Sequence, residues 1–191
     1  ETRGPLAPAS PLSPPRLLLA AGCSVGCPRA AGQGVVGFTE NELLDPDRTI
    51  PLSKQIALGR HIVAARPGVS LGLKALEHFS PAHLGVLGYS LRHCATLGEA
   101  LDTFIRYQTL VTNAVQWRRS GSRIHIGVHP TLKMFLHPVE HMIGMWIVLG
   151  RKLTGQHWLP RAVTFQHQPT GPLSFYCLLY TSDAADDSAC V

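Results

Sequence analysis

The sequence predicts an α+β fold, with a helical N-terminal half followed by a β-hairpin, a long amphipathic helix and a further strand. Apolar residues recur at helical spacing from Leu52 to Val111. They alternate at every second position between Val115 and Val128, and helical spacing then returns over Pro138–Leu153. We therefore expect a small sheet that is covered by helices, in a domain that is truncated at its C-terminal end.

Residues 1–44 predict a poorly ordered N-terminal segment. Six prolines fall among the first thirty residues, and Ala, Gly and Ser supply much of the rest. Such a composition buries too little apolar surface to offset the entropy of ordering, so we expect at most a helical turn over Arg16–Ala21. The folded domain is then expected over residues 45–176.

The first predicted helix follows Asp45–Pro51, where Thr49 can act as its N-cap. The helix is expected to end before Pro67–Gly68. Its apolar face comprises Leu52, Ile56, Gly59 and Val63.

A second helix is predicted to start at Ser80–Pro81, an N-cap residue followed by proline at the first helical position. Its inward residues are Leu84, Leu87 and Leu91. Gly85 and Gly88 lower helix propensity, so we expect close backbone packing at both.

Thr96 and Glu99 have the spacing of a capping box, in which each side chain accepts a hydrogen bond from the other's backbone N–H. This pair gives the best-defined helix start in the chain. The helix that follows is expected to bury one apolar stripe, formed by Leu97, Leu101, Phe104 and Val111.

The hairpin is predicted from two alternating segments, Val115–Arg119 and Arg123–Val128, which flank the Gly-containing link Ser120–Ser122. His125 and His129 share the parity of a strand and could face one pocket together.

The long helix is predicted over Pro138–Leu153, with Gly155 as its terminator. Its stripe comprises Val139, Met142, Ile143, Trp146, Leu149 and Leu153. The final predicted strand is Ala162–His167, with Val163 and Phe165 on one face.

Features at both ends of the sequence indicate that the sequence is not a complete natural chain. It begins at Glu1, and its first methionine is Met134. Residues 177–186 read CLLYTSDAAD, which resembles one reading frame of a transposon-end adapter used for sequencing libraries. We therefore expect residues 177–191 to be a disordered foreign tail. The segment carries three aspartates and no Lys or Arg, so its removal raises the net charge from +5 to +8.

The remaining composition favours a cytoplasmic protein that does not span a membrane. Outside the tail only Cys23, Cys27 and Cys94 remain, which is too few for a disulfide framework, and we interpret them as incidental thiols. No apolar run is long enough to cross a bilayer. The basic residues Arg118, Arg119 and Arg123 cluster at the hairpin tip, where a solvated loop is a better interpretation than a DNA contact.

The segment HPVEH, from His137 to His141, matches the H-x-x-E-H pattern of one group of zinc peptidases. That chemistry needs both imidazoles on one helical face and Glu140 as general base. Pro138 disturbs the first helical turn, and no later Glu is present to serve as a third ligand. The competing interpretation is a surface turn at a helix N-terminus, where the helix dipole favours Glu140.

Four segments together resemble a known family. They are DPDRTIPL (Asp45–Leu52), SLGL (Ser70–Leu73), HLGVLGYSL (His83–Leu91) and TLGEALDTFIRY (Thr96–Tyr107). Their order is similar to the N-terminal regulatory domain of AraC-type bacterial transcription regulators, in the arabinose-binding-domain-like subgroup. The resemblance covers about residues 45–176.

The resemblance implies a domain that senses a small-molecule effector, forms a homodimer, or does both, and that has no enzymatic activity and no cofactor. An amino acid, a sugar or a fatty acid is the kind of effector we expect, and neither its identity nor its binding residues can be read from the sequence. DNA binding in this family is the task of a C-terminal pair of helix-turn-helix motifs, which this chain lacks. The alternative is a small metal-dependent hydrolase using His137, Glu140 and His141, and the metal content of the purified protein separates the two.

Overall fold

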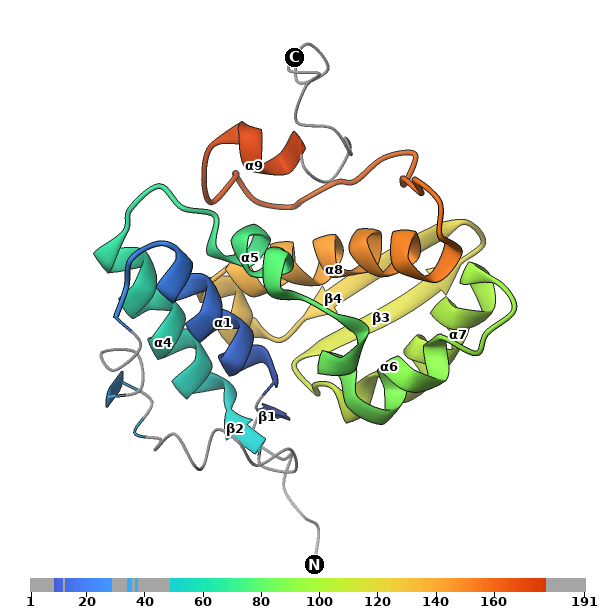
Figure 1. Ribbon diagram of the computed structural model, residues 1–191, viewed down its shortest axis with the longest axis horizontal. Helices are drawn as coiled ribbons and strands as arrows, with labels where there is room; N and C mark the ends of the chain where they lie inside the picture. The colour runs from blue at the N-terminus through green and yellow to red at the C-terminus, as the bar shows by residue number, and fades with distance from the viewer. Residues whose placement is uncertain (1–8, 12, 29–33, 36, 38–48, 178–191) are drawn as a thin grey trace, which may run out of the picture.

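Most of the described chain is helical, and one β-hairpin packs against the helices (Figure 1). The computed structural model describes residues 9–11, 13–28, 34–35, 37 and 49–177. The helices are α1 (Ser13–Ser24), α4 (Leu52–Ala65), α5 (Leu71–Lys74), α6 (Gly85–Leu91), α7 (Leu97–Tyr107), α8 (His137–Thr154) and α9 (Leu173–Cys177). The strands are β1 (Ala9–Pro11), β2 (Thr49–Pro51), β3 (Val115–Ser120) and β4 (Arg123–Val128). None of the described helices is long and apolar enough to cross a membrane.

Helix α1 extends well beyond the helical turn that the sequence predicts. Its Leu17, Leu19 and Ala21 are buried in the main hydrophobic core, and the helix lies beside α4 (Figure 1). Strand β1, just before it, pairs antiparallel with β2, a pairing that no pattern in the sequence predicts. The Pro-, Ala- and Gly-rich composition does not predict this helix, because most of the helix's stability comes from tertiary packing of one apolar face.

Helix α4 has the predicted apolar face but a different start. Thr49 lies in β2 and does not cap the helix, whose N-cap position is occupied by Pro51. Leu52, Ile56 and Gly59 are buried as predicted, whereas Val63 is only partly buried. The end at Ala65, before Pro67–Gly68, is confirmed.

The start signal at Ser80–Pro81 is confirmed, but it opens a 3-10 turn over Pro81–Leu84 before α6 begins. The three predicted inward leucines, at 84, 87 and 91, are all buried. Gly88 is needed for close packing, because an added Cβ would lie 1.8 Å from the carbonyl oxygen of Pro81. Gly85 has a different reason, a backbone φ of +59° that favours glycine.

Helix α7 begins with half of the predicted capping box. The Thr96 hydroxyl accepts a hydrogen bond from the Glu99 N–H at 3.1 Å. The Glu99 carboxylate instead accepts from the N–H of Ala95, at 2.9 Å, one residue before the cap. Of the predicted stripe, Leu101 and Phe104 are buried, and Leu97 and Val111 pack against the core while partly exposed.

The hairpin is confirmed, with Ser120 paired to Arg123 around a tight turn in which Gly121 has a φ of +58°. An aromatic cluster joins it to the helices, since Trp117 of β3 packs against Phe104 of α7 and Trp146 of α8. The three ring centroids lie 5.0–6.1 Å apart. Helices α7 and α8 thus cover one face of the hairpin, as predicted.

The predicted strand Ala162–His167 is wrong, and with it the sheet that it would have completed. This segment is irregular and pairs with no described strand. Val163 and Phe165 still face inward and pack near Leu73 and Ile147. Alternating burial therefore does occur, but a strand also requires a hydrogen-bonded neighbour, and this segment pairs with none of the described strands.

Helix α8 is the central element, and its predicted range and its terminator Gly155, with a φ of 64°, are confirmed. Trp146 and Leu149 of the predicted stripe are buried, but so are Glu140, Met145 and Ile147. The buried surface is wider than one stripe because α7, α5 and the C-terminal segment all pack around this helix (Figure 1).

Replacing Gly72 by alanine is expected to destabilise the fold by about 2–3 kcal/mol, because overpacking a tight contact has a cost of that size. An added Cβ at Gly72 would lie 1.9 Å from the carbonyl oxygen of His137, where α5 crosses the first turn of α8. Gly98→Ala in α7 is the matched control, since its nearest neighbour would lie 3.6 Å away and alanine favours a helix. The urea midpoint of Gly72→Ala should therefore fall, whereas that of Gly98→Ala should rise or stay unchanged. Equal stability of both variants would contradict the close packing at Gly72.

Candidate functional site

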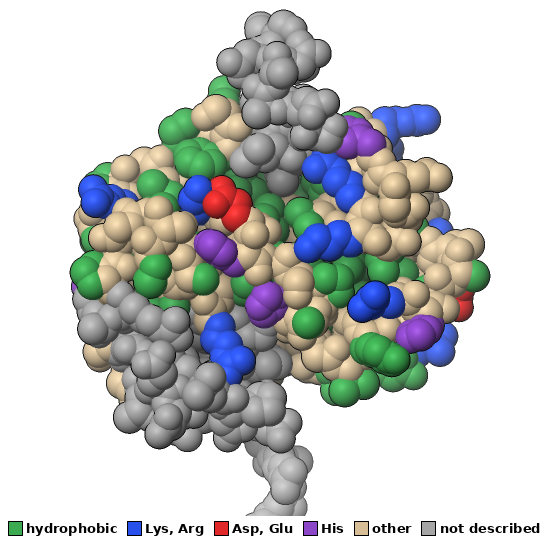
Figure 2. Space-filling view, in the orientation of Figure 1, with side chains coloured by type: hydrophobic (Ala, Val, Ile, Leu, Met, Phe, Trp, Pro, Cys, Tyr) green, Lys and Arg blue, Asp and Glu red, His purple; other side chains and the backbone are tan. Residues whose placement is uncertain are grey.

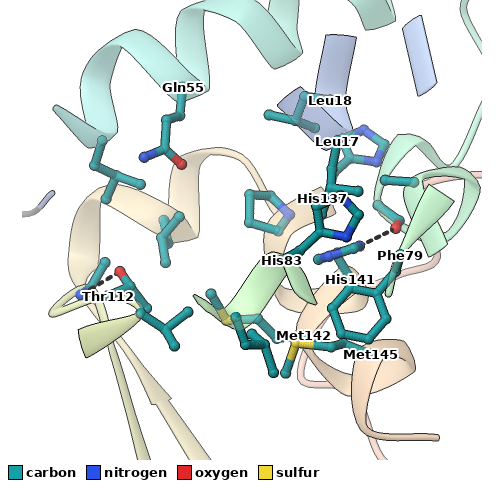
Figure 3. Close-up of a pocket in the computed structure, with 18 of the residues that line it drawn as sticks. Leu17, Leu18, Gln55, Phe79, His83, Thr112, His137, His141, Met142 and Met145 are labelled. Carbon is teal, nitrogen blue, oxygen red and sulfur yellow. Dashed lines mark hydrogen bonds between the residues drawn. The ribbon is translucent and has the colours of Figure 1, made fainter. Parts of the chain in front are cut away.

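An interior cavity of about 90 Å³ lies where the N-terminal helices, the hairpin and α8 meet (Figure 3). Its wall is assembled from segments that are far apart in the sequence, and nearly all of it is apolar. The described lining residues are Leu17, Leu18, Leu52, Gln55, Gly72, Ala75, Phe79, His83, Leu84, Phe104, Gln108, Val111, Thr112, Ala114, Trp117, Leu132, His137, Pro138, His141, Met142 and Met145.

Three imidazoles form the most polar side of this cavity, from His83 before α6 and from His137 and His141 on the first turns of α8 (Figure 3). His141 Nδ1 lies 3.0 Å from the carbonyl oxygen of Gly72. The ring of Phe79 meets that of His141 edge to face, with centroids 6.1 Å apart. These contacts fix the His141 ring against the cavity wall.

Burial keeps the three imidazoles uncharged at neutral pH. It lowers the pKa of His141 to about 4, against a partial opposing effect of the Gly72 carbonyl and a further lowering by nearby His83. The pKa values of His83 and His137 are also lowered, in each case mainly by burial. Among the described residues that line the cavity there is no Asp, Glu, Lys or Arg. The cavity wall is therefore electrically neutral at pH 7.

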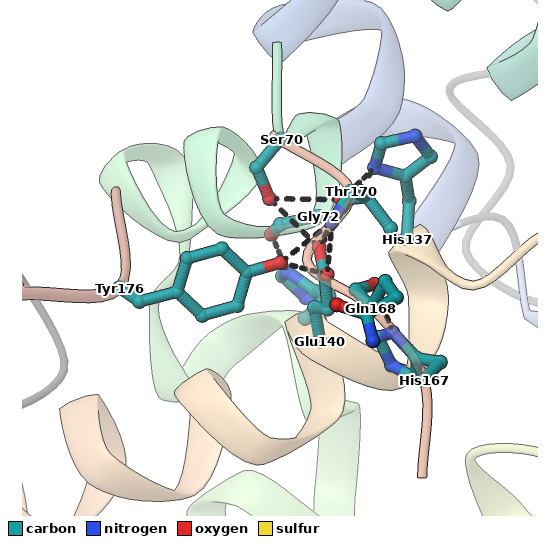
Figure 4. A network of polar contacts seen from close by, with 9 residues as sticks. Ser70, Gly72, His137, Glu140, His167, Gln168, Thr170 and Tyr176 are labelled. Atoms are coloured by element: carbon teal, nitrogen blue, oxygen red, sulfur yellow. Dashed lines mark hydrogen bonds and ion pairs between the residues drawn. The ribbon is translucent and has the colours of Figure 1, made fainter. Parts of the chain in front are cut away.

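Glu140 is the centre of a buried polar network beside the cavity (Figure 4). Its side chain is 0 % exposed, and one oxygen accepts from Ser70 Oγ at 2.7 Å and from the Thr170 hydroxyl. The other accepts from the Thr170 N–H at 3.1 Å and from the Tyr176 hydroxyl. Burial, and then the bond to Glu140, raise the pKa of Tyr176. The network fastens the C-terminal segment to α8 and α5.

His137 belongs both to this network and to the cavity wall. Its Nδ1 lies 3.0 Å from Thr170 Oγ1 and 3.9 Å from the Glu140 carboxylate. One hydrogen bond thus joins this part of the cavity wall to the C-terminal segment (Figure 4).

The structure gives the HPVEH residues a different role from either sequence interpretation. The segment is not a surface turn, since His137 and Glu140 are both buried. The Glu140 carboxylate is fully occupied by protein donors, and Nδ1 of each histidine is held by a protein group. Within the described residues, no three His, Cys, Asp or Glu side chains are grouped to hold a metal ion. A sequence signal for Glu140 existed, because it shares a helical face with Gly144 and Ile147.

Two further sequence-predicted features lie away from the cavity. His125 and His129 are exposed and do not line it, so the expectation that they face a pocket together is wrong. At the hairpin tip Arg119 pairs with Asp102 at 2.8 Å, and Lys and Arg side chains are scattered over the face shown in Figure 2 without forming a stripe. This fits the interpretation of the hairpin tip as a solvated end.

The comparisons place this architecture in a known family. The family model for the arabinose-binding domain of AraC transcription regulators, N-terminal, matches residues 26–189. This range takes in most of residues 177–191, the predicted foreign tail; residues 178–191 lie outside the described part, and that prediction remains untested. A comparison with curated proteins gives no match. The family model covers most of the chain, including α4 to α9 and the whole hairpin, and the chain therefore belongs to the family of N-terminal arabinose-binding domains of AraC transcription regulators.

Proposed function

We propose that this chain is the effector-sensing domain of an AraC-type bacterial transcription regulator, and that the cavity beside α8 receives the effector. The observation that carries the proposal is the cavity itself, a concave apolar site with a few polar groups on one side. Small-molecule sites in proteins have this composition. The domain is proposed to be non-enzymatic and cytoplasmic, to form a homodimer, and to reach DNA only through a C-terminal helix-turn-helix domain.

Sensing requires that the effector favours one of two states of the regulator. The route available here runs from the cavity through His137 to Thr170, and thus to the C-terminal segment held by Glu140. An effector that moves His137 changes how firmly this segment is held on α8. The segment leads toward the C-terminus, where regulators of this family carry their DNA-binding half.

A thermal-shift screen of small metabolites tests the sensing role. A ligand at 100 times its dissociation constant adds about 2.7 kcal/mol to the stability, or roughly 5–10 °C in melting temperature for a domain of this size. Ala114→Leu should abolish the shift, since Ala114 lines the cavity and the larger side chain fills it. Ala100→Leu is the matched control, equally buried but outside the cavity wall.

The same preparations should be examined for self-association by analytical ultracentrifugation. A ligand-induced shift that survives in Ala114→Leu would place the site elsewhere. If a broad library shifts nothing while the chain still forms dimers, the sensing role fails and dimerisation alone remains.

A further inference from the structure

The electrical neutrality of the cavity wall limits the effector that it can hold. A carboxylate or ammonium group buried without a counter-charge costs several kcal/mol. The described lining residues include none that is charged, and His141, with its pKa of about 4, stays neutral at physiological pH. A zwitterionic amino acid or a fatty-acid carboxylate would therefore find no charged partner on the lining itself, although the charges of Arg16 and Lys152 reach His83 from outside it.

The lining carries six hydrogen-bonding side chains, which are Gln55, His83, Gln108, Thr112, His137 and His141. Gln108 is committed to the protein, because its Oε1 accepts from the Trp117 N–H at 2.6 Å and its Nε2 donates to the Ile105 carbonyl at 2.7 Å. A sugar presents hydroxyls on every side and would lose its hydration without replacement in such a site. The wall therefore disfavours a polyhydroxylated ligand.

The tautomers of two histidines define one donor and one acceptor at the same side of the cavity (Figure 3). His141 Nδ1 faces a carbonyl oxygen, so it carries the proton and donates to Gly72. Its Nε2 is then an acceptor, and no described residue donates to it. His83 has the opposite tautomer, since its Nδ1 accepts a hydrogen bond from the Ser80 N–H at 2.9 Å and its Nε2 therefore carries the proton. An acceptor and a donor at one side of an apolar space are what a hydroxyl group needs.

The volume limits the ligand further. An apolar cavity of about 150 Å³ holds benzene, and this one measures about 90 Å³. The thioether side chains of Met142 and Met145 form part of the wall and can repack around a guest. A ligand of about one ring is therefore the size that the cavity can hold once these side chains repack.

We propose that the cavity takes a small, uncharged, mostly apolar molecule with one hydroxyl group, such as a simple phenol or alcohol, and that the hydroxyl donates to Nε2 of His141. The inference rests on the proposed function and names the ligand class of the same site. It departs from the sugar in the family's description and from the amino acids and fatty acids that the resemblance suggested.

Phenol, toluene, L-arabinose, L-arginine and octanoate are the probes that test this class. Binding is followed by the NMR resonances of the methionine methyls, two of which, at Met142 and Met145, lie in the cavity wall. Phenol should shift these two resonances and bind about five- to tenfold more tightly than toluene, as expected for one hydrogen bond. Toluene is the more hydrophobic of the two, so burial alone predicts the reverse order.

The variant His141→Phe should remove the preference for phenol, whereas His125→Phe, on the exposed face of the hairpin, should keep it. If His141→Phe does not fold, the relative affinities of phenol and toluene for the unchanged chain still test the proposal. Equal or tighter binding of toluene would overturn the role of the hydroxyl. Tighter binding of arabinose, arginine or octanoate in the cavity would overturn the ligand class but leave the sensing function intact. If no probe moves either methyl, the proposed ligand class is overturned, whereas the sensing role is decided separately by the metabolite screen.

Discussion

Replacing Glu140 by leucine is expected to lower the free energy of unfolding by about 4 kcal/mol, because each buried donor left without a partner costs about 1–3 kcal/mol. The carboxylate accepts from Ser70, from both the backbone and the hydroxyl of Thr170, and from Tyr176. Leucine has a similar size but no acceptor, so the Ser70 and Tyr176 hydroxyls lose this partner beside a fully buried position, whereas the Thr170 N–H keeps a second acceptor in the Tyr176 hydroxyl at 2.9 Å. The glutamine variant keeps one oxygen and should lose about half as much.

Urea unfolding at pH 7 measures the effect of both Glu140 variants. Glu77→Gln is the control, because its ion pair with Lys74 is largely exposed and is worth at most about 1 kcal/mol. Tyr176→Phe should also increase hydrogen exchange in residues 170–177, since it releases one tie of the C-terminal segment. If Glu140→Leu proves as stable as the unchanged chain, the network is not a structural anchor.

Lowering the pH from 7 to 4 is expected to cost on the order of 3 kcal/mol through His141 alone. Its pKa is about 4 in the folded chain, mainly because of burial, against the ordinary value of 6.5. The unfolded chain therefore binds the proton first as the pH falls. The stability from a neutral His141 is complete above pH 6.5 and is lost progressively between 6.5 and 4.

The pKa values of His83 and His137 are lowered as well, so both residues also reduce the stability of the folded chain as the pH falls. Urea unfolding in steps from pH 7 to 4.5 gives the dependence. His141→Leu should flatten the slope over this range, whereas His125→Gln should not change it. An identical slope in the unchanged chain and in His141→Leu would show that His141 is protonated without penalty.

Local signals in the sequence were sufficient for several elements. The starts at Ser80–Pro81 and Thr96, the turn at Gly121 and the helix end at Gly155 all follow from residues whose backbone preferences act within a few positions. The family could also be recognised, because its sequence patterns lie within continuous segments. These features need no knowledge of what packs against them.

The failures concern residues whose environment comes from distant segments. The strand at Ala162–His167 has the alternating pattern but lacks a pairing partner among the described strands. Helix α1 is longer than the predicted turn at Arg16–Ala21, since its leucines are stabilised by packing on α4 and its neighbours and not by local propensity.

The sequence by itself determined the helix start at Thr96, the helix end at Gly155, the hairpin, and membership of an AraC-type regulatory family. Only the tertiary structure decided what His137, Glu140 and His141 do, although their spacing was plain from the start. Their chemistry depends on Ser70, Gly72 and Thr170, which lie about 30 to 70 residues away along the chain. Burial and hydrogen bonding arise when such segments meet, and no local pattern encodes that meeting.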